Sequence, residues 1–224
     1  MTHRDLRVSI DHVLIAVTDL AESARRFETA YGLRALGGGR HPGVGTANMI
    51  VPLRSEYLEL IAVVDADEAA GAPSSKRITR AIAEGRTFAT WAARTGRLDA
   101  VRERVQAAGF QVPALFAGSR QRPDGVTLRW RTQFLVPPGD PSVLPFVIEW
   151  HVPPGMHPAE TSVEHPSGAS GIRALRLGDP DPDAATGRLR TLLGDVPKVI
   201  IEKASASGVL AVELDTPAGP LIIR

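Results

Sequence analysis

Residues 10–17 read IDHVLIAV, and residues 18–32 continue with TDLAESARRFETAYG. The first stretch alternates its side chains as a half-buried strand does, which places the polar His12 on one of the two strand faces. The second stretch is typical of a short amphipathic helix, with an N-terminal cap at Asp19 and a stop at Gly32. One strand followed by one helix is therefore the unit against which we compare the rest of the chain.

The same strand-and-helix unit recurs twice further along the chain. A second copy covers residues 87–109 and a third covers residues 172–194, and each copy ends at a glycine. Strand-like runs follow every copy, and such internal similarity indicates modules built on one plan. The sequence thus predicts an α+β fold with a first βαβββ module in residues 1–64, a second in residues 76–152, and a C-terminal βαββ appendage in residues 171–224.

Composition excludes several classes of protein. The 26 Lys and Arg residues nearly balance the 25 Asp and Glu residues, so no electrostatic footprint for nucleic acid or an anionic membrane surface exists. The absence of cysteine excludes disulfides, thiolate metal sites and thiol catalysis. No run approaches the roughly 18 to 20 apolar residues that cross a bilayer. We expect a cytoplasmic protein with a small-molecule partner, and a homodimer is a possible assembly.

Charged or imidazole side chains stand inside three of the predicted strands. His12 lies in the first strand, Glu59 lies in YLELIAV at residues 57–63, and Glu149 lies in PFVIEWHV at residues 145–152. A carboxylate among apolar neighbours costs several kcal/mol unless it is paired, protonated or bound to a metal ion. These three residues are therefore the first candidates for a functional site.

Taken together, the motifs resemble the vicinal oxygen chelate superfamily, and within it the glyoxalase-like group. The resemblance rests on DHV at residues 11–13, YLEL at 57–60, PFVIEW at 145–150 and the loop RHPGVGTAN at 40–48, and it covers about residues 8–151. It implies that the two modules pair so that their curved sheets face one cupped cavity.

The resemblance also implies a divalent metal ion. In metal-dependent members the first and fourth strands of each module supply the ligands, which assigns His12, Glu59 and Glu149 to the metal. The first-strand position of the second module falls near Thr90, a departure from the metal-binding pattern, and His151 is a candidate to assist. One imidazole and two carboxylates suit Zn, Fe, Mn or Ni. The alternative is a site that holds no metal.

The implied function is that of a metal-dependent enzyme acting on a small oxygenated metabolite, as an isomerase, a lyase or a ring-opening dioxygenase. Glu59 and Glu149 are the candidate catalytic groups, because a glutamate in apolar surroundings can serve as a base. The candidate substrate-binding residues are His41, Asn48, Thr90, Trp130 and Arg131.

Other interpretations stay open at this point. The same cavity can belong to a non-catalytic protein that binds or sequesters a small molecule, and the departure at Thr90 favours that alternative. Residues 171–224 lie outside the resemblance and are candidates for covering a sheet edge or for mediating dimerisation. We expect His157 and His165, in the Pro-rich segment before that unit, to be solvated.

Overall fold

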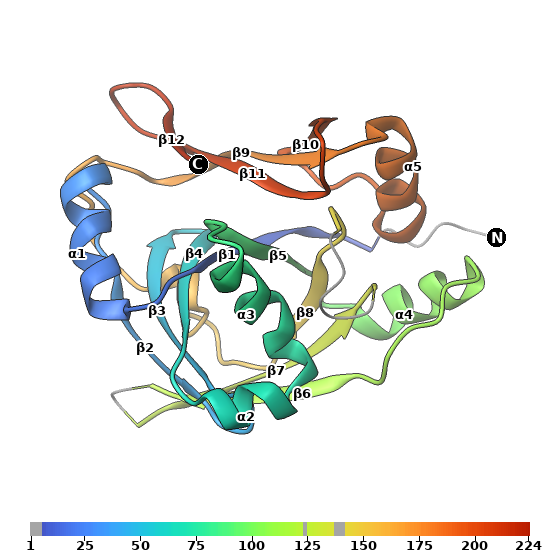
Figure 1. Ribbon diagram of the computed structural model, residues 1–224, viewed down its shortest axis with the longest axis horizontal. Helices are drawn as coiled ribbons and strands as arrows, with labels where there is room; N and C mark the ends of the chain where they lie inside the picture. The colour runs from blue at the N-terminus through green and yellow to red at the C-terminus, as the bar shows by residue number, and fades with distance from the viewer. Residues whose placement is uncertain (1–5, 123–124, 137–141) are drawn as a thin grey trace.

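The structure is a computed structural model that describes residues 6–122, 125–136 and 142–224 (Figure 1). Its elements in chain order are β1 (Ser9–Ala16), α1 (Leu20–Tyr31), β2 (Leu36–His41), β3 (Thr46–Leu53), β4 (Glu56–Val63), α2 (Ala66–Gly71), η1 (Pro73–Ser75), α3 (Lys76–Ala83), β5 (Phe88–Arg94), α4 (Leu98–Ala107), β6 (Phe116–Gln121), β7 (Thr127–Phe134), β8 (Phe146–Trp150), η2 (Pro158–Glu160), β9 (Gly171–Asp179), α5 (Pro182–Leu193), β10 (Val199–Lys203), β11 (Gly208–Asp215) and β12 (Leu221–Ile223). This arrangement confirms the predicted α+β fold class.

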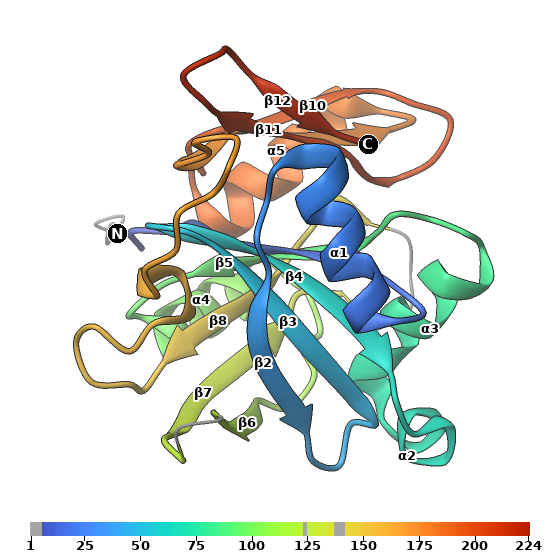
Figure 2. The same cartoon turned by 90° about the vertical axis from the view of Figure 1, so that its left-hand side faces the viewer.

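The caps predicted for the first helix are present. The side chain of Asp19 accepts a hydrogen bond of 2.8 Å from the backbone N–H of Glu22, and Gly32 adopts a left-handed conformation at φ 61°. These two residues fix where α1 begins and ends, and the helix lies along the outer side of the first strands (Figure 2). Within the part of the chain that the structure describes, no helix has the length and apolar character to span a membrane.

Eight strands form one sheet in the order β2-β3-β4-β1-β5-β8-β7-β6. Each half contains one parallel pair, β1 with β4 and β5 with β8, and the halves join where β1 runs antiparallel to β5. The outermost strands β2 and β6 approach each other, and a Cβ on Gly39 would lie 2.8 Å from the backbone oxygen of Gln121. The sheet is therefore a nearly closed cup, and glycine permits the contact at its seam.

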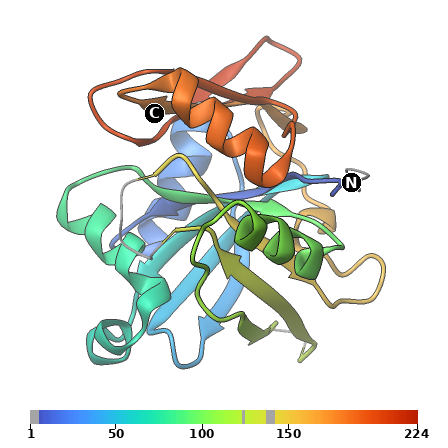
Figure 3. The same ribbon diagram turned by 90° about the vertical axis from the view of Figure 1, so that its right-hand side faces the viewer.

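The convex face of the cup carries the main hydrophobic core. Val13, Leu58, Trp91 and Val147 on that face are fully buried. The second sheet, in the order β10-β9-β11-β12, lies over the convex face, and its helix α5 lies beside α4 (Figures 1 and 3). Leu175 of β9 belongs to the same core cluster, so the C-terminal unit shares its core with the cup.

The segment between β8 and β9 contradicts the prediction that its two histidines are solvated. His157 and His165 are both buried, with 9% and 8% of their surfaces exposed. His165 Nε2 lies 2.7 Å from the backbone oxygen of Pro52, and His157 Nε2 lies 3.0 Å from Asp11 Oδ2. The segment packs back against the first half of the cup, where acceptors on other strands satisfy both imidazoles.

Candidate functional site

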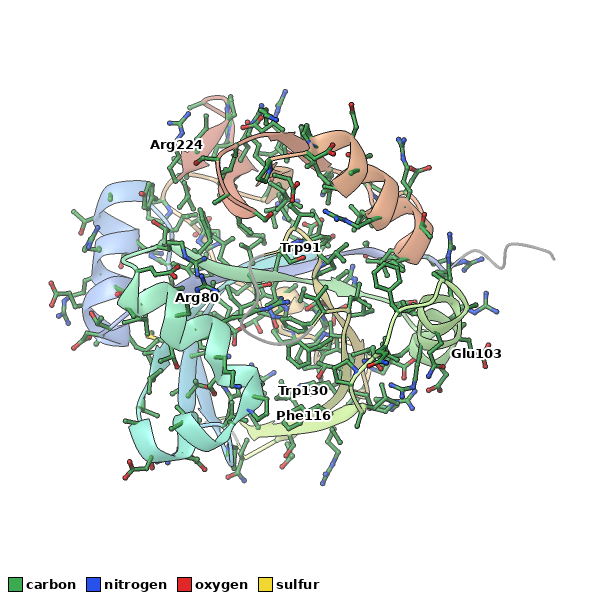
Figure 4. All side chains as sticks on the ribbon, turned by 45° about the vertical axis from the view of Figure 1, so that its right-hand side comes forward. Arg80, Trp91, Glu103, Phe116, Trp130 and Arg224 are labelled. Atoms are coloured by element: carbon green, nitrogen blue, oxygen red, sulfur yellow. The ribbon has the colours of Figure 1, made fainter. Side chains whose placement is uncertain are left out.

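The concave side of the cup encloses a cavity of about 180 Å³. Its acidic and imidazole side chains are Glu59, His12 and His41, all from the first half of the sheet. Its aromatic side chains apart from Tyr57 come from the second half, and they are Phe116, Trp130, Phe134, Phe146 and Trp150. Figure 4 labels Phe116, from β6, and Trp130, from the neighbouring strand β7. One half thus supplies the proton-carrying groups and the other supplies most of the aromatic wall.

His12 and Glu59 form the centre of the site. The neighbouring parallel strands β1 and β4 place His12 Nε2 3.3 Å from Glu59 Oε2, and both side chains are buried. The imidazole stacks on the ring of Tyr57 with a centroid distance of 4.5 Å and an interplanar angle of 14°. The pair is consequently held in one orientation on the cavity wall.

Asp11 supports His12 from behind. The register between β1 and β5 shifts between Ile10 and His12, so Asp11 is the extra residue of a β-bulge. Its fully buried carboxylate accepts from His12 Nδ1 at 2.6 Å and from the indole Nε1 of Trp150 at 3.1 Å, and it also meets His157. This carboxylate fixes the imidazole so that Nε2 is directed at Glu59.

The two carboxylates make His12 a cation. Burial alone would lower the pKa of His12, but the hydrogen bonds and charges of Asp11 and Glu59 outweigh burial and raise the pKa to about 9. Burial alone would raise the pKa of Glu59, yet its bonds with His12 and Asn48 lower that pKa to about 2. The pKa of Asp11 is lowered too, because its bonds to His12 and His157 overcome burial. At neutral pH, therefore, an imidazolium stands between two carboxylates.

Asn48 and His41, which the sequence predicted as substrate contacts, complete the polar wall of the cavity. Asn48 accepts from the backbone N–H of Gly39 at 2.9 Å and donates from Nδ2 to Glu59 Oε1. His41 Nε2 lies 3.3 Å from the Asn48 amide, and burial lowers the pKa of His41. A Cβ on Gly38 would overlap Asn48, so that glycine is required for the amide to reach Glu59.

The other predicted site residues divide between the two faces of the sheet. Thr90 and Trp130 line the cavity, and Thr90 Oγ1 accepts from Arg77 Nη1 at 2.8 Å. Arg131 lies on the convex face and bonds Asp99 and Glu149. Arg131, which the sequence predicted as a substrate contact, therefore does not line the cavity.

Glu149 does not join His12 and Glu59, which corrects the predicted metal-binding and catalytic set. Its neighbours in β8, Ile148 and Trp150, face the cavity, so alternation turns Glu149 to the convex side. There it accepts from the backbone N–H of Leu98 at 3.3 Å, at the start of α4, and His151 Nε2 lies 3.2 Å away. The hydrogen bond from Leu98 and the ion pair with Arg131 explain why the Glu149 carboxylate can be buried.

Strand register explains why Glu149 is not the counterpart of Glu59. Leu14 and Ala92 each lie six residues before the first residue of the next helix, at Leu20 and Leu98. Leu14 pairs with Glu59 and Ala92 pairs with Phe146. The position in the second half that corresponds to Glu59 is therefore occupied by a phenyl ring.

Residues 10–193 match the family described as a glyoxalase-like domain. This chain belongs to that family. The match confirms the resemblance to the vicinal oxygen chelate superfamily drawn from the sequence motifs. No curated protein matches the chain.

Solved structures place the glyoxalase-like chain among related folds. A hypothetical protein from Staphylococcus aureus has 15% sequence identity and a TM-score of 0.75, covering 97% of this chain and 99% of its own, a likeness that shows the fold alone. A Streptomyces coelicolor methylmalonyl-CoA epimerase variant in complex with 2-nitronate-propionyl-CoA has 19% identity and a TM-score of 0.46, covering 62% of this chain and 92% of its own. Methylmalonyl-CoA epimerase from Mycobacterium tuberculosis has 17% identity and a TM-score of 0.46, covering 67% and 91%.

The donor set of this glyoxalase-like domain does not fit the predicted three-ligand metal centre. His12 and Glu59 are ligands of the right type, but Thr90 and Phe146 occupy the corresponding positions of the second half. Among the residues that the structure describes, no three His, Asp or Glu side chains are grouped so that they could hold a metal ion. The site is better described as a buried acid–imidazole network than as a metal centre.

Sequence reasoning missed several residues of the site. Asp11 belongs to the DHV motif, but strict alternation predicts that it lies on the face opposite His12, and nothing in the sequence marks the bulge. His157 lies in a segment whose composition is typical of a solvated loop. Arg77 and Arg120 also line the cavity, and for Arg120 the signal was its alternation with Gly118 along a short strand.

Proposed function

We propose that this glyoxalase-like chain is an enzyme that removes and returns a proton beside a carbonyl group of a small oxygenated metabolite, as isomerases and lyases do. One observation carries the proposal. The Glu59 carboxylate is buried, with 5% of the residue exposed, yet it lines the cavity and is held by His12 and Asn48. A positioned carboxylate on a cavity wall is the arrangement that general base catalysis requires.

The proton transfer assigns a role to each group. The C–H bond of the substrate breaks, its proton passes to a Glu59 oxygen, and the electron pair moves onto the carbonyl oxygen to form an enolate. The proton then returns to carbon or leaves with a departing group. Because its pKa of about 2 makes Glu59 a weak base, the substrate proton must be acidified by the adjacent carbonyl. The charge of His12, whose pKa of about 9 keeps it protonated, stabilises the enolate oxygen.

The aromatic wall supports this chemistry by excluding water. Phe146 and Trp150 flank the network, and the ring of Phe146 lies 5.6 Å from the ring of His12. A less polar surrounding strengthens the electrostatic interactions that stabilise developing charge.

Exchange of substrate protons with solvent tests the proposal. The protein is incubated in D2O with a panel of small 2-oxo and 3-oxo carboxylic acids, and proton NMR follows the signal of the C–H beside each carbonyl. We expect enzyme-dependent loss of that signal for at least one acid, and Glu59→Gln should lower the rate at least a hundredfold. Glu103→Gln, an exposed change on α4 (Figure 4), should leave the rate unchanged. Equal rates in Glu59→Gln and the wild type would refute the role of Glu59.

A second candidate function is sequestration of a small molecule without turnover. The observation that favours it is the second half of the cavity, where Thr90, Phe146 and Ile148 line the wall and none of them is an acid or an imidazole. In that case ligands bind, but no panel member exchanges its protons in D2O. The same experiment therefore distinguishes the two functions.

A further inference from the structure

Arg120 is a buried cation on the cavity wall. It comes from β6, lines the cavity and has only 5% of its surface exposed. Its Nη1 is buried without a hydrogen-bond partner among the described residues, and none of their carboxylates forms an ion pair with it. The fold therefore holds a guanidinium group beside the cavity that has no ion-pair partner within the described part of the chain.

Such a group is costly in the empty protein. A guanidinium stays protonated in proteins, so burial cannot be relieved by loss of the charge. Burial lowers the pKa of Arg120, while the charges of Tyr57 and Glu59 act in the opposite direction. An unpartnered buried charge destabilises the fold, and an unsatisfied buried polar group beside a cavity indicates a missing partner.

The acid nearest to hand is already engaged by other groups. Glu59 is the one acid among the described residues that line the cavity, and it is held by His12 and Asn48. A ligand with one negative charge would supply the missing partner of the guanidinium, whereas a doubly charged phosphate would be repelled more strongly by Glu59.

The rest of the cavity suits a compact apolar body. Six aromatic side chains line it, two of them the indoles Trp130 and Trp150, whose ring centroids lie 5.3 Å apart. A cavity of roughly 150 Å³ holds a benzene ring, and this cavity measures about 180 Å³. The size and lining fit a body of about one six-membered ring.

We infer that Arg120 is the anion-binding group of this cavity and that the ligand is a small monocarboxylate with an apolar or aromatic body. The planar guanidinium fork matches a carboxylate, with which it forms paired charge-assisted hydrogen bonds. The inference rests on the proposed function in that it names the substrate class of the same site. It needs no proton transfer, so it is tested by binding alone.

The test compares phenylacetate with its neutral analogue phenylacetamide by isothermal titration calorimetry at pH 7. In the wild type, phenylacetate should bind at least tenfold more tightly than the amide. Arg120→Met keeps the length of the side chain but removes the charge, and it should bring both ligands to equal affinity. Arg129→Met, which changes an exposed arginine on the neighbouring strand β7, should keep the wild-type preference.

Further measurements test whether a change of ligand preference in Arg120→Met has another cause, such as loss of folding. Without ligand, Arg120→Met should unfold at a higher urea concentration than the wild type, because it removes an uncompensated buried charge. If Arg120→Met does not fold, Arg120→Lys keeps the charge without the fork and should retain part of the preference. An unaltered preference in Arg120→Met, tighter binding of phenyl phosphate than of phenylacetate, or no binding of either ligand overturns the inference. Arg120-dependent binding without proton exchange overturns only the proposed reaction.

Discussion

His157 Nε2 lies 3.0 Å from Asp11 Oδ2, although 146 positions separate the two residues in the chain. The contact joins the segment after β8 to the bulge of β1. Asp11 is completely buried, and the same carboxylate orients His12 toward Glu59. A loop that is distant in sequence therefore helps to set the charge and direction of the imidazole in the cavity.

Asp11→Asn tests this support. The substitution preserves shape but removes the carboxylate charge, so we expect the pKa of His12 to fall from about 9 toward its ordinary value of 6.5. We also expect a loss of about 3 kcal/mol in the free energy of unfolding, because it breaks a buried ion pair. An NMR titration of the His12 ring and urea denaturation measure both effects. Asp195→Asn, at an exposed ion pair, should change stability by less than about 0.5 kcal/mol. An unaltered His12 pKa in Asp11→Asn would contradict the assignment.

Stability should depend on pH with a defined sign. The pKa of His12 is raised from 6.5 to about 9, so its contribution is complete below pH 6.5 and is lost as pH rises toward 9. The pKa of Glu59 is lowered from 4.5 to about 2, so its contribution is complete above pH 4.5 and is lost as pH falls toward 2. The two shifts describe one ion pair and do not add.

Urea denaturation between pH 3 and pH 9.5 measures this dependence. We expect a plateau between pH 4.5 and 6.5 and a loss on the order of 3 kcal/mol on the alkaline side, which is the His12 shift expressed as free energy. His12→Gln should abolish the alkaline slope. An alkaline slope that is equal in the variant and the wild type would assign the effect to another group.

Gly38→Ala tests whether the glycine is needed to place Asn48. The added Cβ would overlap the side-chain oxygen and backbone of Asn48, so we expect a loss of about 1–3 kcal/mol in stability. Displacement of the amide from Glu59 should also raise the pKa of that carboxyl group. Gly187→Ala is the matched control, because it lies in α5 with open space around it and should stabilise the protein by about 0.5–1 kcal/mol. A Gly38→Ala protein as stable as the wild type would show that the strand accommodates the methyl group.

Removal of residues 171–224 should unfold the cup. The unit contributes Ile172, Leu175, Val212 and Leu214 to the shared core, and each buried side chain of this size is worth about 1.5–3 kcal/mol. Their sum is comparable with the whole stability of a typical domain, about 5–15 kcal/mol. We therefore expect residues 1–170 alone to aggregate or to lose near-UV circular dichroism. A folded, ligand-binding fragment would instead identify the unit as a separable appendage.

Local patterns predicted the fold well, because its main elements follow short-range rules. The alternation around His12 and Glu59 assigned each residue to one face of its strand, both of which line the cavity, and the cap at Asp19 located the start of α1. The internal repeat then indicated paired modules, and the family resemblance supplied the cup. Each of these inferences depends on neighbours within a few residues or on a repeated pattern.

The parts of the site that could not be predicted depend on register and on long-range contacts. Glu149 was matched to Glu59 by its place near the end of a strand, but pairing of Ala92 with Phe146 shifts the correspondence by three residues. The bulge at Asp11 reverses the orientation expected from alternation, and His157 becomes buried only because a distant acceptor is present. A single sequence does not encode these relationships in any local pattern.

The separation of the acid–imidazole network from the aromatic wall has a consequence for how this protein could diversify. Substitutions in β7 and β8 can reshape the compartment that selects a ligand while the groups that handle protons stay in place on β1, β3 and β4. Descendants of one ancestor could thereby acquire new ligand preferences without rebuilding their chemistry.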